Sequence, residues 1–190
     1  MTYTNISPPF SLDFREMPKT ELKNYAKWFH EILPVRIKGL ESFVQSTAGF
    51  EKWQADFTPD SLNQLDSWFE EQIETRTMTQ DEIEETRRKL VIPIEIGTTE
   101  LTNRTFSLAI DIGMYLGQTL LKGNPKLKWG QNLKSKRHID YGQPILIGQG
   151  SIPCNPVGLL ITRAYAITRK SKNKKELLET YKIWANILST

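Results

Sequence analysis

Hydrophobic positions recur three and four residues apart over most of this chain, which is the pattern of amphipathic helices. Two helices are expected at the start, over residues 18–33 and 34–48, because Pro34 lacks the backbone donor that a helix interior needs. A Thr-Pro-Asp sequence predicts the start of a third helix over residues 58–75, since it offers a capping side chain, a first-turn proline and an acid.

Two later segments differ sharply in polarity. Residues 79–90 are highly charged, and Thr79 and Glu82 have the spacing of a capping box, so a short surface helix is expected there. Residues 103–121 carry apolar side chains all around the helix axis, which is typical of a helix buried on every side. This second segment is the expected centre of the core.

Short strands are expected in the remaining segments. Residues 126–130 and 143–147 resemble two strands, and the basic stretch 131–141 between them would form a long hairpin loop. Residues 91–97 resemble another strand, which its proline restricts to the edge of a sheet.

The whole pattern predicts a helix-dominant α+β fold in a single domain over residues 1–190. Six or seven helices, including two over residues 155–169 and 174–188, would surround a small antiparallel sheet of two to four short strands. The buried helix at about 103–121 would lie at the centre. Residues 1–16 are expected to form an irregular N-terminal arm, because consecutive prolines oppose a helix.

Composition narrows the cellular setting. Cys154 is the only cysteine, so an internal disulfide is excluded, and a lone thiol suits a reducing compartment. The N-terminus lacks the basic start and apolar run of a signal peptide, and no apolar run approaches the roughly 20 residues of a membrane span. We therefore expect a cytoplasmic protein with no membrane contact.

Charge is unevenly distributed, although the net charge is only +3. Residues 59–100 carry eleven acids and four bases, whereas residues 101–190 carry four acids and fourteen bases. Two interpretations remain open: helix faces that neutralise one another within the fold, or a surface for a charged partner.

Asp111 is the only acid in the expected central helix, and Tyr115 follows it by one turn. A buried carboxylate needs a partner or has a raised pKa. Tyr115, Arg163 or a lysine from residues 126–137 would be the partner of Asp111. Asp111 is then either part of a structural ion pair or a residue for ligand binding or acid–base chemistry.

Gly113 and Gly117 lie one turn apart on the same helix. Each costs about 1 kcal/mol relative to alanine inside a helix. The pair favours close packing of another backbone, with the floor of a ligand groove as the alternative.

The expected hairpin loop combines charge with aromatic residues. Lys134, Lys136 and Arg137 lie between Trp129 and Tyr141. Cations and rings together can contact phosphates and stack on bases, but an ordinary loop or a surface for an acidic protein has the same composition.

No motif indicates a metal, a cofactor or a catalytic site, so none of these is expected. His138 and Asp140 would share a face of a strand, but a zinc site needs three or four ligands. The Gly148-Gln149-Gly150-Ser151 sequence lacks the lysine of a phosphate-binding loop.

Five short motifs carry a resemblance: SLNQLDSWFEEQI, DIGMYLGQTL, PKLKW, YGQPIL and NPVGLL. In their order, they resemble a pattern in small, uncharacterised bacterial proteins, some of which resemble immunity proteins of polymorphic toxin systems. The resemblance implies a partner-binding, non-enzymatic protein. It implies no catalytic residue.

Three functional hypotheses follow. The first is a cytosolic protein that binds and neutralises another protein, such as a toxin, through the basic loop or the acidic helices around residues 70–85. The second is a small-molecule-binding protein or enzyme with a pocket near Asp111, Tyr115, Trp129 and Asp140. The third is nucleic-acid binding through the basic C-terminal half.

Overall fold

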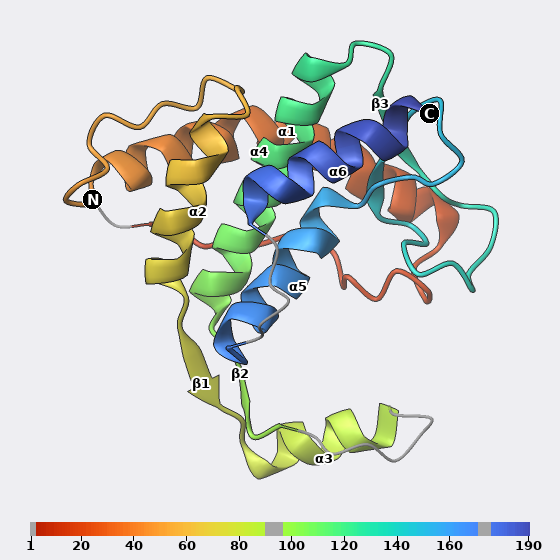
Figure 1. The fold of residues 1–190 in the computed structure, drawn as a ribbon. Coiled ribbons are helices and arrows are strands. Elements are labelled where there is room, and N and C mark those ends of the chain that lie inside the picture. The colour runs from red at the N-terminus through yellow and green to blue at the C-terminus, as the bar shows by residue number, and fades with distance from the viewer. Residues whose placement is uncertain (1–2, 90–96, 171–175) are drawn as a thin grey trace.

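The computed structural model describes residues 3–89, 97–170 and 176–190 (Figure 1). Within these ranges the helices are α1 (Lys19–Gln45), α2 (Ser61–Gln72), α3 (Gln80–Lys89), α4 (Asn103–Gly123), α5 (Pro156–Thr168) and α6 (Leu177–Ser189). The strands are β1 (Thr75–Thr77), β2 (Thr99–Leu101), β3 (Lys128–Gln131) and β4 (Pro144–Ile147). The expected helix-dominant α+β class is confirmed.

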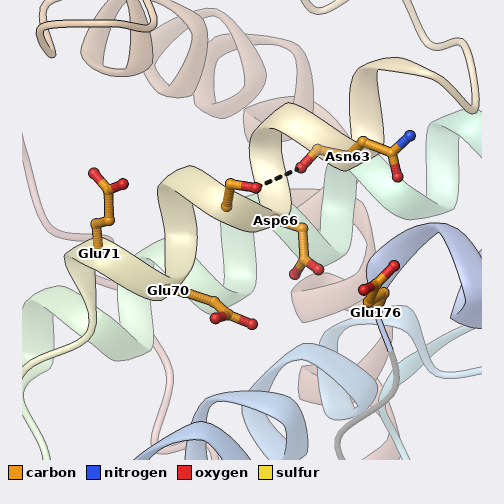
Figure 2. A pocket seen from close by; sticks show the side chains of 6 residues that line it. Asn63, Asp66, Glu70, Glu71 and Glu176 are labelled. Atoms are coloured by element: carbon orange, nitrogen blue, oxygen red, sulfur yellow. Dashed lines mark hydrogen bonds between the residues drawn. The ribbon is translucent and has the colours of Figure 1, made fainter.

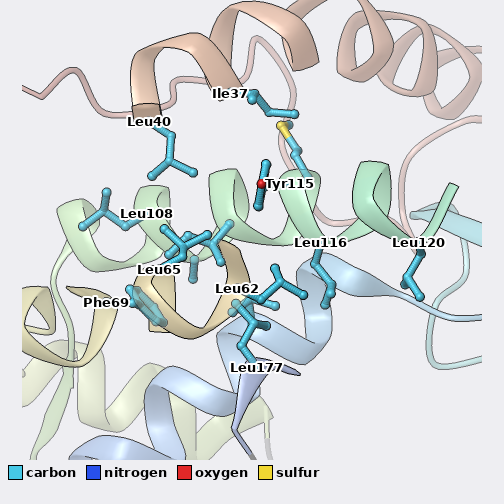
Figure 3. Packing of buried hydrophobic residues seen from close by; sticks show 14 of the residues in the cluster. Ile37, Leu40, Leu62, Leu65, Phe69, Leu108, Tyr115, Leu116, Leu120 and Leu177 are labelled. Carbon is cyan, nitrogen blue, oxygen red and sulfur yellow. The ribbon is translucent and has the colours of Figure 1, made fainter. Parts of the chain in front are cut away.

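Helix α4 forms the centre of the core, as its all-round apolar pattern predicts. Its N-terminus is capped by Thr102, whose hydroxyl accepts a hydrogen bond from the backbone N–H of Thr105. Helices α1, α2, α5 and α6 all pack against it, and Figure 3 shows apolar side chains of α1, α2 and α6 meeting those of α4. None of the described helices combines the length and apolarity that a membrane span requires.

The glycines of α4 allow close approach, by a neighbouring backbone at Gly113 as predicted and by side chains at Gly117. A Cβ at Gly113 would lie 2.7 Å from the Cα of Val157, at the start of α5. A Cβ at Gly117 would collide with the indole ring of Trp129. Packing against neighbouring groups therefore explains both glycines.

Helix α1 continues through Pro34, so the prediction of two separate helices is wrong. Its buried apolar side chains keep one helical spacing on both sides of the proline: Leu22, Phe29, Leu33, Ile37, Leu40 and Val44. Pro34 itself is exposed, so the hydrogen bond lost there lies on the solvent side. Burial of a continuous apolar face outweighs the local cost of the proline.

Two separate antiparallel ribbons replace the single small sheet that was expected. Strands β3 and β4 pair with Trp129 opposite Leu146, which confirms the predicted hairpin and its long loop. Strands β1 and β2 pair elsewhere, and α2 ends at Gln72 instead of residue 75 because the chain there enters β1. Most of the strand expected at 91–97 lies outside the described residues.

The terminal segments largely follow expectation. Residues 3–18 contain no helix or strand, in keeping with an irregular arm. The last helix begins at Leu177, and the earlier part of the prediction, up to residue 175, lies outside the described residues.

Strands β1 and β2 extend away from the helical body and carry α3 at their far end (Figure 1). The predicted capping box is present, because the backbone N–H of Thr79 donates to Glu82 (2.8 Å) and the Glu82 N–H donates to the Thr79 hydroxyl (3.3 Å). Arg76 of β1 pairs with Glu82 and with Glu100 of β2.

Candidate functional site

A hollow of about 650 Å³ lies between α2 and the start of α6 (Figure 2). Its lining residues are Asn63, Asp66, Ser67, Glu70, Glu71 and Glu176. Four of these six described residues are carboxylates and none of the six is basic, so this part of the lining favours a cationic group over an anionic one.

The sequence of α2 explains why this surface is acidic. Its apolar side chains, Leu62, Leu65, Trp68 and Phe69, are fully buried against the core. The helical repeat therefore leaves the opposite positions exposed, among them Asp60 and Glu71. Residues 53–75 contain six carboxylates and no lysine or arginine, so nothing within this segment neutralises them.

Two of the four carboxylates, those of Asp66 and Glu70, form ion pairs with Arg163 of α5. Arg163 Nε donates to Asp66 Oδ1 and its Nη2 to Asp66 Oδ2, both at 2.7 Å, and Nη2 also donates to Glu70 Oε1 at 3.0 Å. The backbone N–H of Leu177 donates to Asp66 as well, which anchors the start of α6. Burial raises the pKa of Asp66, although Arg163 opposes that shift.

Other carboxylates on this side remain available. Within the part of the chain that the structure describes, the side chains of Asp60, Glu71 and Glu176 form no hydrogen bond or ion pair, and all three residues are exposed. A second hollow, of about 440 Å³, shares Asn63 with the first, and its lining includes Asp56 and Asp60 together with one base, Lys52.

We call the surface formed by Asp56, Asp60, Glu70, Glu71 and Glu176 the acidic face. It follows the exposed side of α2 across both hollows. Among residues 3–89, 97–170 and 176–190, no group of three histidine, cysteine, aspartate or glutamate side chains is arranged to hold a metal ion.

Asp111 is fully buried, but its partners are not the expected ones. Arg36 of α1 donates from Nε to Asp111 Oδ1 and from Nη2 to Oδ2, both at 2.8 Å, and the Tyr3 hydroxyl donates to Oδ2 at 2.5 Å. Burial raises the pKa of Asp111 to about 6, against the opposing effects of Arg36 and Tyr3. This cluster fastens the N-terminal arm to α1 and α4.

Tyr115 follows Asp111 by one turn but contacts different groups. Its hydroxyl lies 2.6 Å from the Ser61 hydroxyl and accepts a hydrogen bond from the backbone N–H of Phe57 (3.0 Å). These bonds join α4 to the start of α2. Tyr115 is thus a structural residue, fully buried among the aromatic rings of the core.

Trp129 and Asp140 lie among still other neighbours. Trp129 packs against Phe29 and against Gly117, and its buried indole N–H has no hydrogen-bond partner in the described part of the chain. Asp140 accepts a hydrogen bond from the side chain of Asn155 (2.8 Å). The structure does not bring Asp111, Tyr115, Trp129 and Asp140 together into one pocket, since each already binds a separate set of neighbours.

The basic loop divides into exposed cations and a buried ring. Lys134, Lys136 and Arg137 are exposed, and across the described ranges their side chains form no ion pair. Tyr141, in contrast, is only 3% exposed and packs with Met17 and Leu22 in a second small core. The loop can present charge, but Tyr141 cannot stack on a ligand.

Sequence reasoning missed Arg36 and Tyr3, which lie far from Asp111 along the chain. No local signal could have found them. The absence of lysine and arginine from residues 53–75 was a visible signal for the acidic face. No protein family, curated protein sequence or solved structure matches this chain.

Proposed function

We propose that this is a non-enzymatic cytosolic protein that binds a basic protein through its acidic face and blocks that partner by occlusion. Neutralisation of a toxin is the role that the resemblance to immunity proteins suggests. The proposal rests on the exposed carboxylates of α2 and of the start of α6.

The supporting observation is that Asp60, Glu71 and Glu176 are exposed and, within the described residues, lack an internal partner. Unpaired charges of one sign produce a local potential that speeds the approach of an oppositely charged protein and selects against wrong partners. The neighbouring hollows, of about 650 and 440 Å³, give protruding lysine or arginine side chains a place to enter.

The basic loop gives weaker support to the alternatives. Its three exposed cations could attract an acidic protein or a nucleic acid. Binding of single-stranded nucleic acid usually adds aromatic rings on which bases stack, and Tyr141 is buried. We therefore place the partner at the acidic face.

Affinity purification from the cell that makes the protein tests this proposal, with eluates analysed by mass spectrometry and for nucleic-acid content. We expect one basic protein in stoichiometric amount at low salt and less of it at moderate salt, because salt screens exposed charges. Nucleic acid that departs with salt, without a protein, would favour the third hypothesis. The absence of any stoichiometric protein at both salt concentrations would contradict the proposal.

A further inference from the structure

A cavity of about 430 Å³ lies between the N-terminal arm and α1, next to the cluster of Asp111, Arg36 and Tyr3. Its floor is one face of α1, where Val35, Lys38, Gly39 and Ser42 recur at helical spacing. The rings of Tyr3 and Phe43, whose centroids are 5.0 Å apart, form a wall. The cavity thus combines apolar surface with polar groups from a single helix, which is the usual composition of a small-molecule site.

Gly39 is the feature of this cavity that packing does not explain. A Cβ built at Gly39 meets no atom within 4 Å, whereas Gly113 and Gly117 are each crowded by a neighbouring group. Glycine destabilises the interior of a helix relative to alanine. At Gly39 the cost has no compensating contact within the described protein, and the missing side chain deepens the cavity instead.

The charge of the cavity is positive. In the described part of the chain, the Lys38 ammonium and the Ser42 hydroxyl have no hydrogen-bond or ion-pair partner. Arg36 also lines the cavity, although Asp111 and Tyr3 engage most of its N–H groups. None of the described lining residues is acidic. An anionic group would therefore meet free donors, and the carboxylate of Asp111, which touches Tyr3 and Arg36, is already paired with Arg36.

Apolar surface completes the site. Val35 is 70% exposed and lies one turn from Lys38 and Gly39. The ring of Phe43 contributes a second apolar surface. A ligand that covers both would remove apolar area from water while its charged end reaches Lys38.

We propose that this cavity binds a small amphiphilic anion, with a carboxylate or phosphate head on a compact apolar body. Lys38 and Ser42 hold the head through charge-assisted hydrogen bonds. Val35 and Phe43 contact the body, and Gly39 lets that body lie close to the backbone of α1. This site is separate from the acidic face and does not depend on the proposed partner.

Fluorine NMR titration of the full chain tests the site with three probes: para-trifluoromethylbenzoate, para-trifluoromethylphenyl phosphate and the neutral para-trifluoromethylbenzamide. We expect saturable binding of at least one anion, about tenfold or more tighter than the amide, because the charged head gains charge-assisted bonds. The anion that binds more tightly identifies the preferred head group. Equal binding of all three probes, or no saturable binding of either anion, would overturn the proposal.

Variants separate this site from nonspecific binding. Gly39→Leu fills the floor and is expected to abolish binding, and Lys38→Gln is expected to weaken it about tenfold. Gly39→Ala is the folding control. We expect it to raise the Tm, and that result would show that position 39 tolerates a side chain in the folded protein. Lys27→Gln, at an exposed position of α1 outside the cavity, is the matched control and should bind normally. Unchanged anion binding by a folded Gly39→Leu variant would refute the assignment.

Discussion

Asp111 and Glu71 are both carboxylates on helices of the same body, but their surroundings differ completely. Asp111 on α4 is fully buried and receives hydrogen bonds from Arg36 and Tyr3. Glu71 on α2 is exposed and has no side-chain partner in the described residues. Burial and pairing commit the first to the fold, whereas the second is free to meet a partner. Mutation should therefore lower the unfolding free energy strongly at Asp111 and hardly change it at Glu71.

The largest expected effect is on the buried cluster. Asp111→Ala leaves the mostly buried Arg36 charge without its ion-pair partner, and we expect a loss of about 3–5 kcal/mol of unfolding free energy. Urea unfolding at neutral pH, followed by tryptophan fluorescence, measures this loss. The double variant Asp111→Ala with Arg36→Met should lose less unfolding free energy than the sum of the losses of the two single variants, because it no longer contains an unpaired buried charge. Strict additivity would show that the pair does not act as a unit.

The pH dependence of stability also reports on the burial of Asp111. Burial raises the pKa of Asp111 from 3.8 to about 6, so the folded chain holds this proton more tightly than the unfolded chain. The resulting stabilisation is fully present below about pH 4 and is lost as the pH rises through 6. Relative to Asp111→Asn, the unchanged chain should therefore gain up to about 3 kcal/mol between pH 7 and pH 4. Parallel stability curves for the two proteins would contradict this account.

The acidic face should contribute little to stability. Glu71→Gln removes an exposed charge that has no partner, so we expect its unfolding free energy to stay within about 0.5 kcal/mol of the unchanged value. The same urea titration provides the comparison with Asp111→Ala. A loss above about 1 kcal/mol would mean that Glu71 supports the fold.

Local sequence patterns predicted the parts of the fold that local forces determine. The all-round apolar pattern identified α4, and the capping side chain of Thr79 marked the start of α3. Pro34 was misleading because propensity cannot weigh a local defect against burial along the whole of α1. Strands β1 and β2 pair with each other although α3 lies between them in the sequence, and short-range spacing does not encode such a pairing.

The candidate site was less predictable for the same physical reason. Asp111 was recognised as a buried acid, but its arginine lies 75 residues away in the sequence and reaches it only through the packing of α1 on α4. The acidity of residues 53–75 could be read directly, whereas the division between committed Asp66 and free Glu71 depends on Arg163 of α5. Gly39 gave no signal in sequence, because only the structure shows that nothing packs against it.

Paired charge reversals test whether the partner binds at the acidic face or at the basic loop. The full chain is used as bait for its partner in three forms: unchanged, Glu71→Lys with Glu176→Lys, and Lys134→Glu with Lys136→Glu. Circular dichroism first checks that all three are folded. The account predicts that the first double variant loses the partner and the loop variant retains it, because Glu71 and Glu176 line the hollow of the acidic face. Retention by the first variant and loss by the loop variant would place the contact on the basic loop and contradict the account.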